Sequence, residues 1–345
     1  MDPRSEVILR QIDFLKGSVL LVGCSVDGLV DQLKQQPAIT HLHAWTWFND
    51  DYQLLLAQHP QHCSFGITPP DQTYDQVIVF LPKSKELVHY LLHQAATHLA
   101  PSGQIFLVGE KRAGIERAAK QLSQFGKTLK LDSARHCQLW LCHEIQPQQE
   151  KSLQQWTNHY QVNVDNIAQS ITIISLPGVF SHGRLDQGSA LLVEHLNNLP
   201  KGDLLDFGCG AGVIGTLLKK IYPAQSVYFL DIDAFALEST RLTLQANDIA
   251  LNDSVHLIAG RGIIDAPKNL AAIISNPPFH QGIRTHYQAS EDLLKHSVKH
   301  LKSGGELRIV ANNFLRYSPL IEQQFGHCHT LGQRHGFNVY QAKCR

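Results

Sequence analysis

The sequence lacks several features that would assign it to a broad class of proteins. Its 30 basic and 30 acidic residues cancel, so the overall charge does not indicate a nucleic-acid-binding protein, and any RNA contact must come from a local basic patch. No apolar run approaches the length of a membrane span, and the N-terminus lacks the basic-then-apolar pattern of a signal peptide. We therefore expect a cytoplasmic protein with no membrane partner.

Paired cysteines are also missing. The seven cysteines include no C-x-x-C pair, which argues against a zinc ribbon, and an odd number in a long chain argues against a disulfide framework. His327, Cys328 and His329 resemble a metal cluster, but on a strand their side chains would alternate between the two faces. We expect no metal site, because tetrahedral zinc needs four convergent ligands.

A glycine-rich stretch in the second half is the feature around which that half is organised. An apolar run from Leu204 contains Asp206, enters a tight turn and continues as an apolar helix over Val213–Ile221. Glycines let the backbone turn sharply and approach a ligand closely, and a helix N-terminus offers N–H groups to an anion. The pattern is typical of a nucleotide-binding turn, although a turn of this kind can also exist without a ligand. The turn residues are Gly208, Cys209, Gly210 and Gly212.

The next two expected strands carry groups suited to a nucleoside. Val227–Asp231 ends in an acid 23 residues after Gly208, where doubly wound sheets place a carboxylate on ribose hydroxyls. Asp233 either assists or caps the following helix. The strand over residues 255–260 has no acid at its end, so an adenine ring would be recognised by backbone groups of Ala259 and Gly260.

The most specific motif is Asn276-Pro277-Pro278-Phe279, which follows a buried apolar strand. The prolines restrict the backbone and fix carbonyl directions at the edge of the sheet where ligands bind. An exocyclic amine must pyramidalise before it attacks a methyl group, and two hydrogen-bond acceptors on its N–H groups favour that change. The Asn276 side-chain oxygen and the Pro277 carbonyl can supply both acceptors, and Phe279 offers a face for stacking.

The first half repeats the same order of elements in a weaker form, with a spacing of roughly 180–200 residues, which indicates a duplicated domain. Strands alternating with helices predict an α/β protein with two mostly parallel, doubly wound sheets. We expect domains at residues 1–150 and 165–345, joined by a glutamine-rich linker. The first copy lacks the dense glycines and the Asn-Pro-Pro-Phe motif, so it would be a non-catalytic scaffold or an RNA-docking domain. Its candidate RNA contacts are Lys83, Lys85, Lys111, Arg112 and Arg117.

The loop before the second glycine turn contains Phe180, Arg184 and Asp186, and we expect an amphipathic helix over Ser189–Leu199 to follow it. Such residues are frequent in functional loops. The alternative is a domain-entry loop with an internal pair between Arg184 and Asp186.

Together these motifs resemble class I S-adenosylmethionine-dependent N-methyltransferases, which are Rossmann-like. The tandem copy and the Gly178–Ser181 loop are similar to the bacterial 16S ribosomal RNA guanine-N2 methyltransferases, small-subunit type C. The resemblance implies S-adenosylmethionine as donor and a guanine of 16S rRNA in the 30S subunit as acceptor, with Asp206 near the donor amino group. We expect a monomer and direct transfer to guanine N2. Candidate substrate contacts are Arg184, His280 and Arg284, although the loop sequence at His182 and Arg184 departs from the family pattern.

Three alternatives remain open at this point. A protein glutamine-N5 methyltransferase uses the same motif on another planar amide, and an adenine-N6 DNA methyltransferase is also related. A non-catalytic RNA-binding assembly factor belongs to a different class. Cys209 could be mistaken for a nucleophile, but nothing near it in the sequence would lower the pKa of its thiol.

Overall fold

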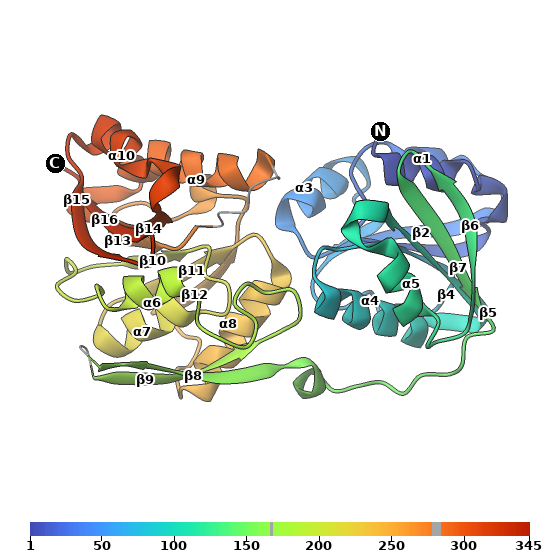
Figure 1. The fold of residues 1–345 in the computed structure, drawn as a ribbon, viewed down its shortest axis with the longest axis horizontal. Coiled ribbons are helices and arrows are strands. Elements are labelled where there is room, and N and C mark those ends of the chain that lie inside the picture. The colour runs from blue at the N-terminus through green and yellow to red at the C-terminus, as the bar shows by residue number, and fades with distance from the viewer. Residues whose placement is uncertain (166–167, 278–283) are drawn as a thin grey trace. The chain divides into compact units, whose positions relative to one another are not determined.

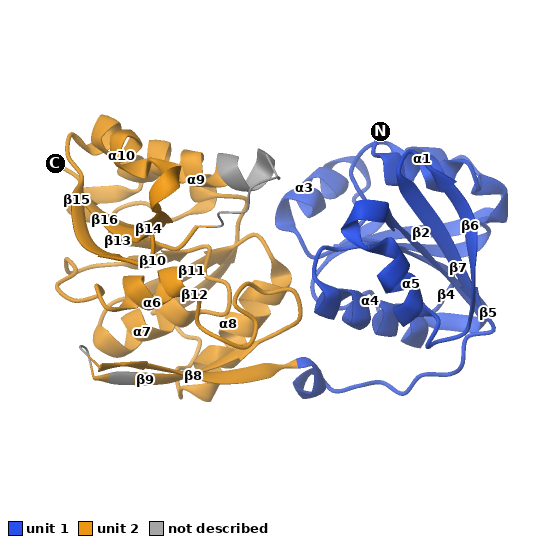
Figure 2. Cartoon of the chain, in the orientation of Figure 1, with its two compact units in different colours: residues 1–156 blue, residues 157–345 orange. Residues whose placement is uncertain are grey.

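The computed structural model describes residues 1–165, 168–277 and 284–345 (Figure 1). The chain forms two compact units, residues 1–156 and 157–345 (Figure 2). Unit 1 contains α1 (Pro3–Leu9), β1 (Gly17–Val22), α2 (Leu29–Lys34), β2 (Ile39–Thr46), α3 (Asn49–Gln58), β3 (Cys63–Phe65), β4 (Tyr74–Phe80), α4 (Lys85–Thr97), β5 (Leu99–Glu110), α5 (Ile115–Leu122), β6 (Lys127–Ala134) and β7 (Cys137–His143).

Unit 2 begins with a hairpin and then repeats the same succession. Its elements are β8 (Asn158–Val164), β9 (Gln169–Ser175), α6 (Gln187–Val193), β10 (Leu204–Phe207), α7 (Val213–Ile221), β11 (Val227–Asp231), α8 (Ala234–Ala246), β12 (Val255–Ala259), β13 (Leu270–Ser275), α9 (Arg284–His296), β14 (Leu301–Asn312), α10 (Tyr317–Phe325), β15 (His329–Arg334) and β16 (Phe337–Lys343).

The two seven-stranded sheets have the same topology. Their orders are β3-β2-β1-β4-β5-β7-β6 and β12-β11-β10-β13-β14-β16-β15. In each sheet, the strand second from one edge, β7 or β16, runs antiparallel to the other six strands. The expected α/β fold with two mostly parallel sheets is confirmed, and the identical order agrees with a duplication.

Alternating side chains of the central strands explain why helices cover both faces of each sheet. In β1, Val19 and Leu21 pack into the core that includes side chains of α1 and α2, and Leu20 and Val22 point to the opposite face. In unit 2, Leu205 and Phe207 belong to the core shared with α9 and α10. The other face of that sheet carries α6, α7 and α8 (Figure 1).

The β8–β9 hairpin is attached to α8 by polar side chains. Ser239, Thr243 and Asn247, spaced four residues apart along one face of the helix and its C-terminal cap, accept hydrogen bonds of 2.9–3.0 Å from alternate backbone N–H groups of β9 and the residue after it. These side chains accept the hydrogen bonds that a neighbouring strand would accept at that edge of the hairpin. Without them, the buried N–H groups of β9 would be unpaired, which would destabilise the fold.

Two local expectations were wrong. The helix expected over Ser189–Leu199 is α6, which begins at Gln187 and ends at Val193. The Arg308 guanidinium donates to the carbonyls of His195 and Asn197 at 2.6 and 2.7 Å, so these carbonyls are satisfied outside a helix. The expected strand over residues 327–329 is also displaced, since β15 begins only at His329.

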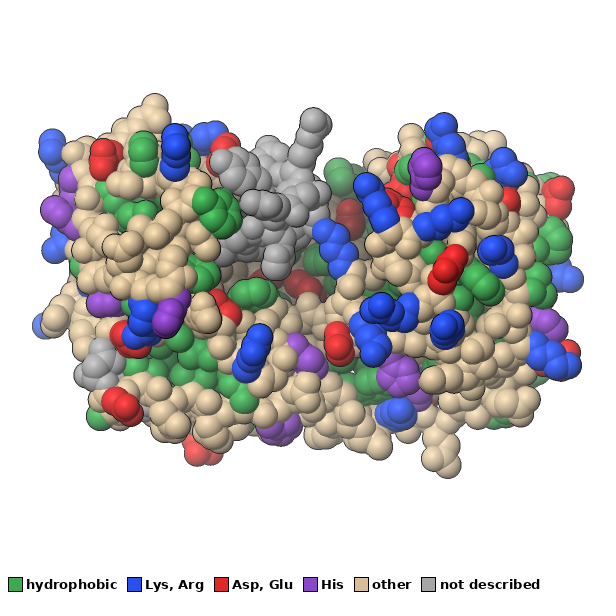
Figure 3. Space-filling view, viewed as in Figure 1, with side chains coloured by type: hydrophobic (Ala, Val, Ile, Leu, Met, Phe, Trp, Pro, Cys, Tyr) green, Lys and Arg blue, Asp and Glu red, His purple; other side chains and the backbone are tan. Residues whose placement is uncertain are grey.

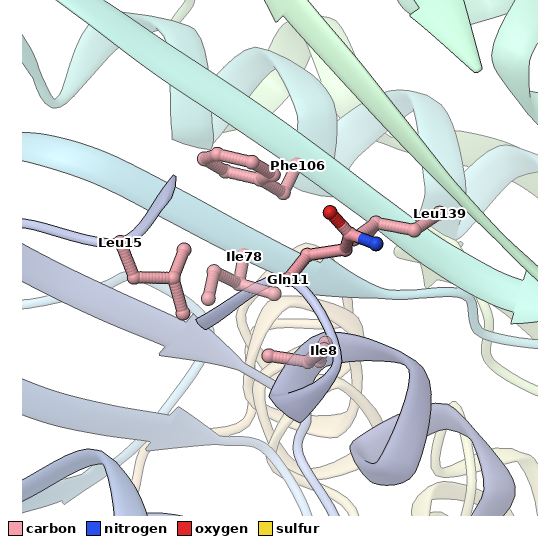
Figure 4. A pocket seen from close by; sticks show the side chains of 6 residues that line it. All are labelled: Ile8, Gln11, Leu15, Ile78, Phe106 and Leu139. Atoms are coloured by element: carbon pink, nitrogen blue, oxygen red, sulfur yellow. The ribbon is translucent and has the colours of Figure 1, made fainter. Parts of the chain in front are cut away.

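A small apolar pocket in unit 1 lies between the sheet and α1 (Figure 4). It leaves no room for a water molecule and offers one polar side chain, Gln11, whose amide donates to Asp132. The lining residues are Ile8, Gln11, Leu15, Ile78, Phe106 and Leu139. Across the described ranges of the chain, no helix is long and apolar enough to cross a membrane.

Gly215 in α7 is required by close packing. A Cβ built at this position would overlap a ring carbon of Phe229, a fully buried residue of β11. We expect Gly215→Ala to lower the free energy of unfolding by about 1–3 kcal/mol in urea titrations, because overpacking forces neighbouring elements apart. Lys220→Ala, on a partly exposed position of the same helix, should change it by less than about 0.5 kcal/mol. Equal effects of the two substitutions would contradict the packing argument.

Candidate functional site

Three loops of unit 2 leave the sheet at the same level. Phe207, the last residue of β10, pairs with Leu230 on one side and with Ser275 on the other. The residues that follow in the three strands therefore meet at the carboxyl edge of the sheet. These residues are Gly208, Asp231 and Asn276, which the sequence assigned to three parts of one site.

The backbone of the glycine turn is hydrogen-bonded to β11 and borders open space at two of its glycines. Its first N–H groups, Gly208 and Cys209, donate to the Leu230 carbonyl at 2.8 and 3.1 Å. Gly208, Gly210 and Gly212 all have positive φ angles, of 71°, 55° and 79°, which favour glycine. A Cβ at Gly208 or Gly210 would meet no atom within 4 Å, whereas at Gly212 it would lie 2.9 Å from Thr240 Oγ1. Gly208 and Gly210 thus border open space, and Gly212 permits packing against α8.

Asp231 organises the turn from the neighbouring strand. Its Oδ2 accepts a hydrogen bond from the Gly210 N–H at 2.9 Å, and its Oδ1 accepts one from the Asp233 N–H at 3.0 Å. Asp233 caps α8 by accepting from the Phe235 N–H at 2.8 Å. Burial, together with the charge of Asp231, raises the pKa of Asp233 to about 8.

Asp206 is an acid with an unpaired oxygen in the interior. Its side chain is fully buried; Oδ2 accepts from the Gly215 N–H at 2.8 Å, and Oδ1 has no hydrogen-bond partner among the described residues. Burial, with a smaller contribution from the charge of Asp231, raises the pKa of Asp206 to about 7. A buried carboxylate without a cation is costly, so a ligand carrying N–H groups or positive charge would suit this position.

Cys209 is not placed to act as a nucleophile. Its side chain is buried, and burial raises the pKa of its thiol well above the usual value. The Thr240 hydroxyl lies 3.4 Å from the sulfur and 3.0 Å from the Gly210 carbonyl. A thiol that remains protonated is a poor nucleophile, so Cys209 has a packing role in the turn.

Asn276 is held by two side chains from the start of α6. Its Nδ2 lies 2.8 Å from Ser189 Oγ and 3.2 and 3.3 Å from the two oxygens of Asp186. No group in the described part of the chain donates to its Oδ1. The following residue, Pro277, is buried. The amide of half-buried Asn276 is therefore held through its nitrogen, at the level of the sheet where the glycine turn begins.

The remaining expected site residues have different positions. Ala259 ends β12 and is exposed, and the Gly260 N–H donates to the Asp231 carbonyl at 3.0 Å. Arg184 is exposed, and the described residues contain no ion pair between it and Asp186, so the internal pair expected in that alternative was wrong. Pro278, Phe279 and His280 lie outside the described residues, as does the side chain of Arg284 at the start of α9.

The corresponding edge of unit 1 is filled by its own side chains. Its strand register places Leu21, Thr46 and Phe80 where unit 2 has Asp206, Asp231 and Asn276. A Cβ at Gly23 would lie 2.6 Å from the Trp47 ring, and the Arg4 guanidinium lies 5.4 Å from the centre of the Phe80 ring. Unit 1 therefore lacks the open space at its first glycine, and it lacks the two acids and the amide that unit 2 carries at these three positions.

Comparison with known proteins matches both units of the chain to methyltransferase domains. The methyltransferase small domain matches residues 170–341, and its N-terminal counterpart matches residues 5–160. A ribosomal RNA small subunit methyltransferase C of Stutzerimonas stutzeri is 52% identical over 342 residues, 99% of each chain. The protein of the same name from Pseudomonas syringae pv. tomato is 51% identical over 343 residues, also 99% of each chain. The chain belongs to the ribosomal RNA small subunit methyltransferase C family.

The fold of this family member is also shared with a solved structure. That structure is described as the T. thermophilus 16S rRNA N2 G1207 methyltransferase (RsmC) in complex with AdoMet and guanosine. It matches with a TM-score of 0.84 at 22% identity, covering 100% of this chain and 92% of that chain. At this identity the likeness establishes the common two-unit fold, which the sequence motifs predict.

The sequence did not predict that Ser189 and Asp186 both contact Asn276. The residues Asp186, Gln187, Gly188 and Ser189 form a cap at the start of α6, in which the Asp186 side chain accepts from the Gly188 and Ser189 N–H groups. An acid immediately before a helix is a recognisable capping signal. Nothing local indicates that the same carboxylate also reaches a residue 90 positions away.

The raised pKa of Asp206 predicts a pH-dependent stability. The folded protein binds a proton at Asp206 more tightly than the unfolded chain does, so this group stabilises the fold at low pH and loses that contribution as the pH rises toward 7. Without added ligand, Asp206 should contribute about 2–3 kcal/mol to the fall in the free energy of unfolding between pH 5 and 8.5, in addition to the fall caused by Asp231 and Asp233, whose pKa values are also raised. Asp206→Asn, which keeps an acceptor for the Gly215 N–H, should make the fall smaller by about this amount in urea titrations at both pH values. An equally steep fall in the variant would contradict the assignment.

Proposed function

We propose that unit 2 transfers a methyl group from S-adenosylmethionine to the exocyclic N2 of a guanine in 16S rRNA, within the 30S subunit. The observation that carries this proposal is the fixed Asn276 oxygen beside an open glycine turn. Membership of a ribosomal RNA methyltransferase family favours an RNA acceptor over a protein or DNA acceptor. The T. thermophilus protein of the same fold is an N2 methyltransferase of 16S rRNA solved with AdoMet and guanosine, which supports the same chemistry here.

The residues of the glycine turn fit the donor. Open space in front of Gly208 and Gly210 leaves room for its methionine part, and the unpaired Asp206 oxygen suits its ammonium group. The partly exposed Asp231 carboxylate has lone pairs left for ribose hydroxyls, and the backbone at Ala259 and Gly260 borders the adenine position. When bound, the donor supplies a methyl group activated by a positively charged sulfur.

The chain's own contribution is to position the acceptor amine. The guanine amine is flattened because its lone pair is delocalised into the ring. Asn276 Oδ1 and the Pro277 carbonyl would each accept a hydrogen bond from one N–H group of the amine. These two hydrogen bonds would favour the pyramidal form of the amine, with its lone pair directed at the methyl group. Holding two reactants in this geometry accounts for a large part of catalysis by such enzymes, and no covalent intermediate is needed. A guanine within a helix must first leave the base stack.

Unit 1 is proposed as a non-catalytic docking domain for RNA. Lys83 follows β4 and Lys111 follows β5, two adjacent parallel strands, so both lie at the carboxyl edge of its sheet. Lys85, Arg112 and Arg117 are also exposed in this region. Figure 3 shows basic side chains gathered on the face of unit 1 that carries α4 and α5 in Figure 1. Phosphate contacts of this kind position an RNA without reading its sequence.

We further propose that the enzyme acts as a monomer in the cytoplasm; unit 2 by itself brings the glycine turn, Asp231 and Asn276 to one edge of its sheet. Incubation with labelled donor should transfer label to 30S subunits from a strain lacking this enzyme, and nuclease digestion should recover it as N2-methylguanosine. Naked 16S RNA, DNA and a release factor serve as alternative acceptors. Label found only in DNA or protein would contradict the proposal, and donor binding without any transfer would favour an assembly factor.

Asn276→Ala tests the acceptor role of the amide. We expect the rate of transfer to fall by about 100-fold or more, because one fixed acceptor for the amine is removed. The dissociation constant of the donor, measured by calorimetry, should change by less than about twofold, since the glycine turn is untouched. Full activity in this variant would refute the role assigned to Asn276.

The basic edge of unit 1 makes a separate prediction about RNA affinity. In Lys83→Ala/Lys111→Ala, the slope of log affinity for 30S subunits against log salt concentration should fall by about two, one for each lost phosphate contact. Lys16→Ala is the matched control, because this exposed lysine precedes β1 at the opposite edge of the same sheet. Unchanged salt dependence in the double variant would show that this edge does not touch RNA.

A further inference from the structure

We propose that Asp186 is a positioning residue for methyl transfer: it holds the amide of Asn276 so that the oxygen, and not the nitrogen, faces the acceptor amine. This inference rests on the proposed function and adds a residue to its machinery. Asp186 itself would touch neither donor nor acceptor. It acts through Asn276, which directly follows β13 of the same unit.

The chemistry of the contact determines which way the amide faces. An ionised carboxylate can only accept hydrogen bonds, whereas an asparagine amide has one donating and one accepting end. Both Asp186 oxygens lie 3.2–3.3 Å from Asn276 Nδ2, and no described group donates to Oδ1. The Ser189 hydroxyl, 2.8 Å from the same nitrogen, could pair with either end of an amide. The carboxylate is therefore the group that selects the orientation.

Asp186 is itself held rigidly. It caps α6 by accepting from the Gly188 N–H at 2.9 Å and from the Ser189 N–H at 3.2 Å. A Cβ at Gly188 would lie 3.1 Å from Asp186 Oδ1 and 3.3 Å from the Phe337 ring, so a glycine allows this close approach. Just before the cap, the His182 ring joins the loop to the hairpin, at 2.6 Å from Asn158 Nδ2 and 2.9 Å from Ser175 Oγ.

Without the Asp186 carboxylate, the Asn276 amide could adopt either of two orientations. An amide turned by 180° would direct its NH₂ group at the NH₂ group of the acceptor, and two donors cannot form a hydrogen bond with each other. The fraction of enzyme with the oxygen facing the amine would fall, although the amide would still be present. We therefore expect an effect on the chemical step, with little effect on donor binding or on folding.

Asp186→Asn separates positioning from capping. The introduced amide keeps an oxygen for the Gly188 and Ser189 N–H groups, so α6 remains capped. It no longer presents two acceptors to Asn276. We expect kcat for methylation of 30S subunits to fall about 10- to 100-fold, with the donor dissociation constant within about twofold and the thermal midpoint within about 3 °C of wild type. Asp253→Asn, an exposed acid before β12, is the matched control and should keep the wild-type rate.

An exchange of the two side chains gives the decisive measurement. Asn276→Asp alone places two carboxylates beside each other, and we expect it to be less active than Asp186→Asn. In Asp186→Asn/Asn276→Asp, the introduced amide can donate to the introduced carboxylate, whose other oxygen again faces the amine. The double variant should recover at least about tenfold in kcat over Asn276→Asp alone, a coupling that a merely structural cap would not produce.

The outcomes distinguish this inference from the proposed function. If wild type and Asp253→Asn methylate guanine N2 and Asp186→Asn has the same kcat, or the double variant shows no recovery, the positioning role is overturned and the proposed function stands. If wild type itself gives no N2-methylguanosine, the proposed function fails and this inference fails with it.

Discussion

The parallel register between β10, β11 and β13 is the constraint on which the site depends. Because Phe207 pairs with both Leu230 and Ser275, the glycine turn, the Asp231 carboxylate and the Asn276 amide all leave the sheet at one level. The Ser275 hydroxyl, fully buried, strengthens this register by donating to the Phe207 carbonyl at 2.8 Å. A shift of one residue in either pairing would direct these side chains to the wrong face, since side chains alternate along a strand.

The same constraint explains how one fold can hold two units with different roles. Both sheets have the same strand order, and in unit 1 the register of β1 with β2 and β4 is regular from Val19 to Val22, at the carboxyl end of the strand. What differs is the identity of the residues at the carboxyl edge, where unit 1 has Leu21, Thr46 and Phe80 in place of two acids and an amide, and a tryptophan against Gly23. Filling that edge stabilises a fold that no longer has to keep space for a ligand. The fold class therefore says little about which unit is catalytic, whereas the edge residues do.

The sequence predicted what short-range patterns determine. The bounds of α7 and β11, Val213–Ile221 and Val227–Asp231, were predicted to the residue, because glycine turns and apolar runs define them locally. The end of α6 was not, since it depends on Arg308, more than 100 residues away along the chain. The pairing of Asp186 with Asn276 was missed for the same reason. An acid at a helix start has a sufficient local explanation as a cap, and only the fold shows its second contact.

Burial of acids near the glycine turn is the part of the structure that packing does not explain. Asp206 is fully buried with one oxygen unpaired, and partial burial raises the pKa values of Asp231 and Asp233 as well. In a protein selected for stability alone, an apolar residue or a paired cation would replace such a group. A cationic donor that binds at this turn would offset the cost of the ionised acid. The buried acid lowers the stability of the free protein, and binding of a positively charged ligand would restore that stability. The site would therefore bind a positively charged ligand more tightly than a neutral one.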